Sequence, residues 1–188
     1  MDKLRLELAL TGSYCSFGKL QTVLPELCRR FDVLPIFSAN ALKDSRFGAG
    51  ADWLALLAES TGRDPVISVA QAEPLGPKGL IDVLAIVPCT GNTLAKLSRG
   101  VTDTAVTMAA KGHLRNGKPM VIGVSTNDGL AASAENIGRL LVRKNVYFVP
   151  FGQDDPDVKP TSLSCRYERI APAVREAYAG RQLQPILA

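Results

Sequence analysis

Three polar segments each follow an apolar run in this sequence, and their side chains suit the binding of an anion or a polar substrate. The segments are Thr11–Ser16, Thr90–Thr93 and Ser125–Gly129. Their serine and threonine hydroxyls can donate to a phosphate or a carboxylate, and their asparagine amides can both donate and accept. Asp128 is in addition a candidate proton acceptor. The residue types therefore allow both binding and proton transfer.

The apolar runs indicate where these segments lie in the fold. Val83–Val87 is apolar without alternation, which is typical of a parallel strand covered on both faces. Ligands of open α/β sheets bind at the carboxyl ends of such strands. Ser38, Asn92 and Asn127 follow three different runs, so we expect all three at the same edge of the sheet.

Each of these residues also has a purely structural interpretation. Ser16 could cap a helix, Ser38 could form a turn, and Asn92 could cap the helix that follows it. The segment Asn127–Gly129 has the composition of an ordinary turn. Only the coincidence of three polar corners at one sheet edge favours a binding site.

The first polar segment resembles nucleotide-binding loops without matching one. Gly12 and Gly18 are separated by five residues, and Leu20 stands where a Walker A loop has its metal-binding hydroxyl. The dinucleotide fingerprint GxGxxG is absent as well. A glycine-serine turn that leads into a helix remains, and the N-terminus of such a helix suits a phosphate.

Composition excludes several classes of protein. The 188 residues carry a net charge of +4, and their basic residues are scattered, which argues against nucleic-acid binding. The single histidine, His113, and four dispersed cysteines do not form a zinc motif. We find neither a signal peptide nor a membrane span. These features predict a cytoplasmic protein with free thiols.

Strand and helix patterns alternate along the chain and predict one domain over residues 1–188, a three-layer α/β fold with a mostly parallel sheet. Glu73–Pro77 is expected to be irregular, and Pro150–Ser164 to be a long loop. The expected strands are Leu4–Leu10, Val33–Phe37, Pro65–Val69, Val83–Val87, Met120–Val124 and Val146–Val149. The expected helices are Leu20–Arg30, Asp52–Glu59, one that starts near Leu94, Asp103–Lys111, one around Ile137–Leu141, and Ile170–Tyr178.

The segment Pro88–Thr93 (PCTGNT) resembles the Pro-Ala-Ser/Thr-Ala-Asn-Thr signature of the homo-oligomeric flavin-containing cysteine decarboxylases, a flavoprotein superfamily. That resemblance implies a Rossmann-like or flavodoxin-like fold, a homo-oligomer, and FMN bound at subunit interfaces. The FMN-binding residues that it implies are Gly12, Ser13, Tyr14, Ser38, Thr90, Gly91, Asn92, Thr93, Ser125 and Thr126.

The chain departs from the decarboxylases at two places. Their Pro-x-Met-Asn-x-x-Met-Trp segment aligns with Val124–Ala131, where only Asn127 is kept, and their active-site histidine falls near Glu73–Pro77, where no histidine occurs. A stand-alone FMN-dependent decarboxylase is therefore an alternative that the sequence disfavours.

Longer blocks resemble a second family, the B subunits of dipicolinate synthase. They include Glu73–Leu75, Leu114–Pro119, Tyr147–Asp154 and Gln182–Pro185. This resemblance implies an NAD(P)-binding A subunit as partner and the oxidation of a dihydrodipicolinate-type dicarboxylate to dipicolinate in the mother cell of a sporulating bacterium. Catalytic candidates are then Asn92, Asn127 and Asp128. The alternative is a non-catalytic subunit that binds substrate or supports assembly, with the redox step in the partner.

Overall fold

A parallel sheet forms the centre of the molecule. The computed structural model describes residues 3–76 and 81–188. Its parallel strands are β1 (Leu4–Leu10), β2 (Phe31–Phe37), β3 (Val83–Cys89), β4 (Met120–Thr126) and β5 (Val146–Phe148), in the spatial order β2-β1-β3-β4-β5. The strand order reverses between β1 and β3, and doubly wound sheets bind ligands at such a switch point.

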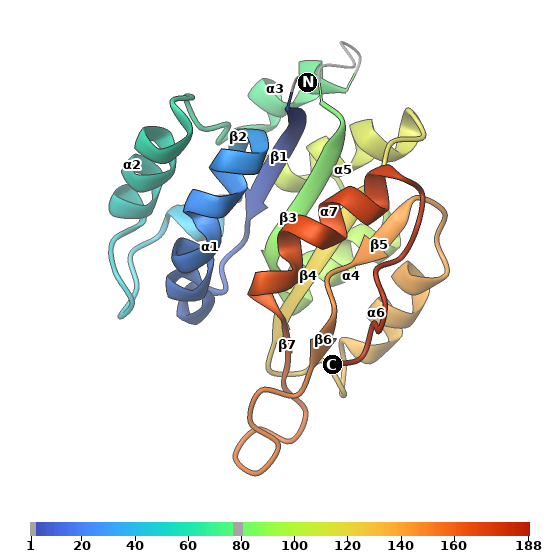
Figure 1. Ribbon diagram of the computed structural model, residues 1–188. Helices are drawn as coiled ribbons and strands as arrows, with labels where there is room; N and C mark the ends of the chain where they lie inside the picture. Colours follow the sequence, from blue (N-terminus) through green and yellow to red (C-terminus); the bar gives the residue numbers. More distant parts are fainter. Residues whose placement is uncertain (1–2, 77–80) are drawn as a thin grey trace.

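Two short antiparallel strands extend the sheet beyond the end of β4. Strand β7 (Leu163–Cys165) pairs with the last residues of β4, and β6 (Phe151–Gly152) pairs with β7. The segment between β6 and β7 projects past the carboxyl ends of the parallel strands (Figure 1). The antiparallel pair therefore brings residues from late in the chain to the edge where the polar segments lie.

Helices cover both faces of the sheet, which confirms the three-layer fold (Figure 1). One layer holds α1 (Phe17–Arg30), α2 (Gly50–Thr61) and α7 (Ile170–Tyr178). The other holds α3 (Val69–Ala72), α4 (Gly91–Arg99), α5 (Ala105–Arg115) and α6 (Ala134–Leu141). Every residue of β3 is buried, as its unbroken apolar run requires. Single 3-10 turns are η1 (Tyr14–Ser16), η2 (Ala39–Leu42), η3 (Glu73–Leu75) and η4 (Tyr167–Arg169).

Several element boundaries follow from local chemistry. Helix α4 begins after Thr90, whose side chain accepts a hydrogen bond from the backbone N–H of Thr93. It ends at Gly100, whose φ of 76° lies in the left-handed region. Gly62 ends α2 in the same conformation. These polar and glycine residues fix the start of α4 directly at the end of β3.

Three sequence-based expectations about elements are wrong. Pro65–Val69 is not a strand: only Val66 forms an isolated bridge, to Ile36, and Val69 already begins α3 because Ser68 caps it. The expected loop 150–164 contains β6 and the start of β7. Asp103 lies outside α5, which starts at Ala105 after the Thr104 cap. Glu73–Leu75 forms a 3-10 turn, and Pro77 lies outside the described residues.

None of the helices within residues 3–76 and 81–188 combines the length and the apolar character that crossing a membrane requires.

Candidate functional site

The switch point between β1 and β3 is closed by a small hydrogen-bond network. Thr11 directly follows β1, and its hydroxyl donates to the carbonyl of Pro88 at 2.8 Å. The same oxygen accepts from the backbone N–H of Thr90 at 3.0 Å. The two polar segments are therefore held together where the strand order reverses.

Two cavities open on either side of this junction, and both are lined by Gly12, Tyr14 and Thr90. The β2-side cavity, of about 400 Å³, extends to Ser38 and the start of α4. The β4-side cavity, of about 430 Å³, extends to the end of β4 and the β6–β7 segment. Both volumes fall in the usual range of small-molecule sites.

Uncharged donors dominate the β2-side cavity. The oxygen of Ser38 accepts from the backbone N–H of Ala41 at 3.3 Å, so its hydroxyl hydrogen is free to donate outward. The Tyr14 hydroxyl donates to the carbonyl of Asn40 and joins the first polar segment to η2. Among the described residues, no acidic side chain lines this cavity, and the one cation on its lining is Lys96. The lining therefore suits a negatively charged group such as a phosphate.

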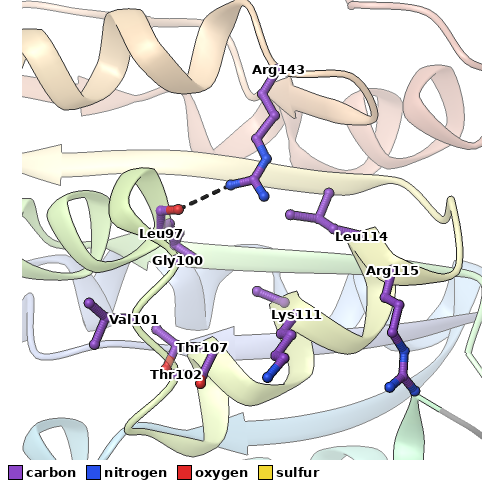
Figure 2. Close-up of a pocket in the computed structure, with 10 residues that line it drawn as sticks. Leu97, Gly100, Val101, Thr102, Thr107, Lys111, Leu114, Arg115 and Arg143 are labelled. Atoms are coloured by element: carbon purple, nitrogen blue, oxygen red, sulfur yellow. Dashed lines mark hydrogen bonds between the residues drawn. The ribbon is translucent and has the colours of Figure 1, made fainter.

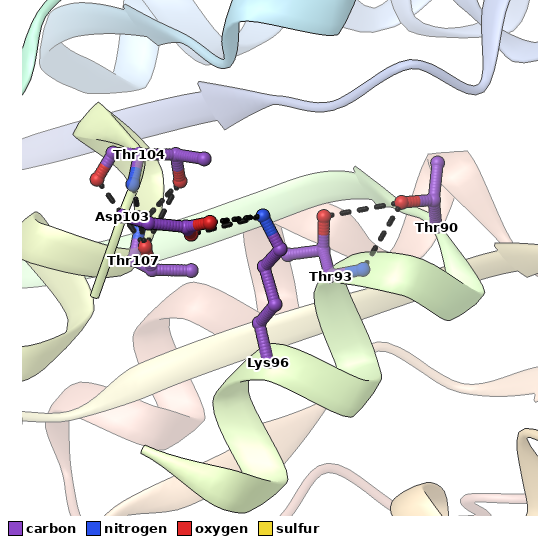
Figure 3. Close-up of polar contacts among 6 residues, drawn as sticks. All are labelled: Thr90, Thr93, Lys96, Asp103, Thr104 and Thr107. Atoms are coloured by element: carbon purple, nitrogen blue, oxygen red, sulfur yellow. Dashed lines mark hydrogen bonds and ion pairs between the residues drawn. The ribbon is translucent and has the colours of Figure 1, made fainter. Parts of the chain in front are cut away.

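A series of polar contacts runs along one wall of the β2-side cavity, from Thr90 to Thr107 (Figure 3). The Thr90 hydroxyl donates to Thr93 at 3.1 Å, and Lys96, one turn further along α4, forms an ion pair with Asp103 at 2.7 Å. Lys96 lowers the pKa of Asp103 below its ordinary value. Thr104, the next residue, shares a reciprocal pair of hydrogen bonds with Thr107. These contacts hold the loop between α4 and α5 against α4.

Three serine hydroxyls meet at the floor of the β4-side cavity, and the hydroxyl of Tyr167, which does not line that cavity, lies next to them. The Ser125 oxygen lies 2.8 Å from that of Ser13 and 2.7 Å from that of Ser16. The Tyr167 side chain is only 5% exposed, and its hydroxyl has no hydrogen-bond partner of good geometry among the described residues. Burial raises the pKa of Tyr167 well above its usual range, while Ser16 and Ser125 act in the opposite direction. Tyr167 is therefore a neutral donor with unused hydrogen-bonding capacity.

Two of the cysteine thiols are buried in the core. Cys89 and Cys165 are buried, and all four cysteines are free. Burial raises the pKa of Cys89 above its usual range and that of Cys165 to about 12. Because the thiolate is the nucleophile, neither side chain is activated at neutral pH. Across residues 3–76 and 81–188 no three His, Cys, Asp or Glu side chains are grouped as metal ligands.

Asp128 holds the third polar segment in shape. Its Oδ1 atom accepts from the Thr126 hydroxyl at 2.5 Å and from the Ser133 hydroxyl at 2.9 Å. Gly91 packs against the same three side chains, since a Cβ on it would lie 2.6 Å from Ser133 Oγ and 2.9 Å from the other two oxygens. The end of β4 and the start of α4 therefore approach more closely than any residue with a side chain would allow.

Comparison with known proteins identifies the family. The flavoprotein family model matches residues 1–146 of the chain. The dipicolinate synthase B subunit from Bacillus subtilis (strain 168) is 40% identical over 185 residues, which cover 97% of this chain and 92% of the relative. The chain belongs to the flavoprotein family, in the group of the dipicolinate synthase B subunits.

Solved structures of flavoprotein-type chains share the fold. The crystal structure of the dipicolinate synthase B subunit from Bacillus halodurans C has a TM-score of 0.90 and 39% identity, and the match covers 100% of this chain and 98% of that one. The Burkholderia xenovorans protein DmrB, solved in complex with FMN, has a TM-score of 0.64 and 20% identity over 78% of this chain and 87% of its own. At that identity the second likeness shows the fold alone.

The structure brings most of the predicted site residues of this flavoprotein to one sheet edge, but divides them between the two cavities. Asn92 and Asn127 are exposed and line different cavities, while Asp128 lines neither. Ser16 is not a helix cap, because its hydroxyl turns to Ser125, and Thr90 rather than Asn92 caps α4. Gly12, Tyr14, Ser38, Asn92, Thr90 and Thr93 line the β2-side cavity, and Gly12, Ser13, Tyr14, Thr90, Ser125, Thr126 and Asn127 line the β4-side cavity.

Sequence reasoning did not identify Tyr167 or Lys19 as site residues. Tyr167 lies beside the floor because β7 pairs with the end of β4, and the sequence indicated a loop at the start of β7 instead of a strand. Lys19 lines the β4-side cavity from the first turn of α1. Its place next to Gly18 in the near-match to a Walker A loop was the available signal.

Proposed function

We propose that this chain is the FMN-binding B subunit of a dipicolinate synthase and that it oxidises a dihydrodipicolinate-type dicarboxylate together with an NAD(P)-binding A subunit in the mother-cell cytoplasm. The observation that carries the proposal is the pair of cavities that meet at the β1–β3 switch point. The family and its relatives agree with it.

The β2-side cavity fits FMN. Ser38 has a free hydroxyl hydrogen for a phosphate oxygen, and no carboxylate of the described residues lines the cavity to repel the phosphate. Gly12 lies against Asn40, where a Cβ would come within 3.2 Å of the Asn40 Cβ, so glycine favours the close approach of these two segments. Thr90, Gly91, Asn92 and Thr93 would meet the ribityl chain and ring. FMN supplies an acceptor for the hydride equivalent that leaves the substrate during aromatisation.

The β4-side cavity suits the dicarboxylate. Ser13 and Ser125 would donate to one carboxylate, with the unpaired hydroxyl of Tyr167 behind them. Lys19 and Lys159 line the same cavity, and with Asp154 as the opposing carboxylate the lining keeps a net positive charge. Hydrogen bonds to a charged group contribute about 1.5–3 kcal/mol each. The exposed amide of Asn127 would orient the ring. Substrate would then lie beside Gly12, Tyr14 and Thr90, next to the cofactor.

Aromatisation also releases a proton, and Thr126 offers a route for it. The Thr126 hydroxyl lines the β4-side cavity and donates to Asp128 Oδ1. A proton taken up by the Thr126 oxygen can therefore pass to the Asp128 carboxylate without Asp128 contacting the substrate. We assign Asp128 as the proton acceptor in this relay.

A second candidate is a non-catalytic subunit that binds the substrate while the partner performs the redox step. Its support is the lining itself, because hydroxyls and amides bind ligands but do not titrate near neutral pH. Both functions require the same dicarboxylate site, so they differ in the role of FMN.

Two measurements test the proposal. Titration of the purified chain with FMN, followed by quenching of flavin fluorescence, should show saturable binding at one FMN per chain. The activity of each subunit should be low alone and high in the mixture. A chain that binds no FMN, together with a fully active partner alone, would assign the redox step to the partner.

A matched pair of variants places the cofactor. Asn92→Ala removes an amide at the β2-side cavity and should weaken FMN binding about tenfold, the expected loss for one hydrogen bond to a ligand. Ser60→Ala changes an exposed polar residue of α2 and should leave FMN binding unchanged. Equal affinities in the two variants would move FMN away from Asn92.

A further inference from the structure

An aromatic side chain that the proposed function does not use lies on the β4-side cavity. Phe47 lines this cavity from the connecting segment 43–49, which leads from η2 to α2. Phe47 and Leu163 are the only hydrocarbon side chains that the described residues place on its lining, where hydroxyl, amide and charged groups predominate. Tyr14, the other aromatic residue of the lining, also borders the β2-side cavity, whereas Phe47 does not. Phe47 is therefore the flat apolar surface that belongs to the proposed substrate site.

The connecting segment holds Phe47 in place through its own contacts. Its ends approach so closely that a Cβ on Gly50 would lie 1.9 Å from the carbonyl oxygen of Leu42. Ser45 and Gly48 exchange two backbone hydrogen bonds, at 3.0 and 3.1 Å, across the turn that contains Phe47. Gly48 closes this turn with a φ of 127°, a value that favours glycine. The fold of the segment therefore places Phe47 at the cavity without the help of a ligand.

The Phe47 ring is open to a ligand. The residue is 44% exposed and is not part of the hydrophobic core. The guanidinium of Arg46 lies over one face of the ring, 4.8 Å from its centroid, and such a cation–π contact is attractive. Because Arg46 occupies one face, the opposite face and the edge remain for contact with a second ring. A single exposed phenylalanine is ordinary on a protein surface, but this one borders a polar cavity that is proposed to bind a ring.

The ligand proposed for this cavity becomes flat during the reaction. A dihydro ring contains tetrahedral carbon and puckers, whereas the aromatic product is planar. Two aromatic rings attract each other in offset-stacked or edge-to-face arrangements by more than the area that they bury. We propose that Phe47 makes this contact and is the residue that selects planar, unsaturated ring dicarboxylates over saturated ones. The inference rests on the proposed function, because it assumes that the β4-side cavity binds the dicarboxylate.

A pair of ligands tests this selection by titration calorimetry. Dipicolinate is planar, whereas cis-cyclohexane-1,3-dicarboxylate carries its two carboxylates in the same relative positions on a saturated, puckered ring. Phe47→Leu keeps an apolar side chain but removes the aromatic ring. It should weaken dipicolinate binding about fivefold and leave binding of the cyclohexane compound within about twofold. Phe47→Tyr keeps the ring and should bind dipicolinate as the natural chain does.

Tyr178→Leu is the matched control for the loss of an aromatic side chain. Tyr178 is exposed at the end of α7 and lines neither sheet-edge cavity. Its replacement should leave the affinity for both ligands unchanged. FMN affinity should stay the same in Phe47→Leu as well, since Phe47 lies outside the β2-side cavity. Circular dichroism would verify that each variant is folded.

A second place on the chain could attract a dicarboxylate by charge alone. A cavity of about 410 Å³ lies beside the end of α4 and along α5, and Figure 2 shows its cations Lys111, Arg115 and Arg143. Within residues 3–76 and 81–188, neither an acidic nor an aromatic side chain lines it. Lys111→Gln removes one of these charges and should leave the dipicolinate affinity unchanged.

The results separate this proposal from the one on which it rests. A natural chain that binds neither ligand would overturn the dicarboxylate site and with it the role of Phe47. Equal affinities of the natural chain and Phe47→Leu for dipicolinate would overturn the role of Phe47 alone. Equal losses for the two ligands would overturn the selection of planar rings. A loss in Lys111→Gln in place of Phe47→Leu would move the ligand to the cavity of Figure 2.

Discussion

Glu7 on β1 and His113 on α5 face each other in the interior, with Glu7 Oε2 and His113 Nε2 3.0 Å apart. Glu7 is fully buried and His113 is 5% exposed. Their second polar atoms, Glu7 Oε1 and His113 Nδ1, have no hydrogen-bond partner among the described residues. Each side chain therefore depends on the other, and the pair fixes α5 against the strand that leads to Gly12.

Removal of one member of this pair should be much more harmful than removal of both. Glu7→Ala or His113→Ala alone should lower the free energy of unfolding by about 3–5 kcal/mol, because an uncompensated polar group stays buried. Glu7→Leu with His113→Phe should recover most of the loss. Urea denaturation measures all three, and a single variant that loses under about 1 kcal/mol would contradict the prediction.

Tyr167→Phe should weaken ligand binding without lowering the stability of the protein. The lost hydroxyl has no partner of good geometry among the residues that the structure describes, so its removal should leave the melting temperature equal or higher. Binding of dipicolinate, measured by calorimetry, should weaken about tenfold, while FMN affinity should stay the same. Unchanged dipicolinate binding would remove Tyr167 from the substrate site.

Gly91→Ala should disturb the junction between α4 and the end of β4. The new Cβ would lie 2.6 Å from Ser133 Oγ, so we expect destabilisation of about 1–3 kcal/mol and weaker FMN binding. Gly138→Ala is the control, since a Cβ there meets no atom within 4 Å on helix α6. The control should be stabilising by about 0.5–1 kcal/mol. Similar thermal stabilities of the two variants would show that α4 can move away from Ser133.

Asp82→Asn should destabilise the protein at neutral pH but not in acid. Arg5 holds the pKa of Asp82 below its ordinary value through hydrogen bonds at 2.8 and 2.9 Å. Stability from a lowered carboxyl pKa is present above the unfolded-state pKa and disappears as the pH falls through the folded-state pKa. The melting temperatures of the natural chain and the variant should therefore converge as the pH falls below about 4, the ordinary range of a carboxyl pKa. Asp64→Asn, at an exposed carboxylate, should show no such convergence, because it should match the natural chain at every pH.

The sequence was most informative where local chemistry decides structure. The apolar run that became β3 and the polar corners of the switch point were both predictable. Pro65–Val69 failed because a proline and a serine cap outweighed its β-branched residues. The burial of Glu7 could not be predicted, since it depends on His113, which is 106 residues away. The position of Tyr167 likewise depends on tertiary contacts, which no local pattern records.

The antiparallel pair β6–β7 has a consequence for divergence within the flavoprotein family. The residues proposed to hold the cofactor follow the parallel strands, whereas Lys159, Ser162 and Ser164 line the β4-side cavity from the segment that holds β6 and β7. The β6–β7 pair joins the parallel sheet at the last two residues of β4. Changes in the β6–β7 pair can therefore alter substrate preference without altering the residues proposed to bind the cofactor.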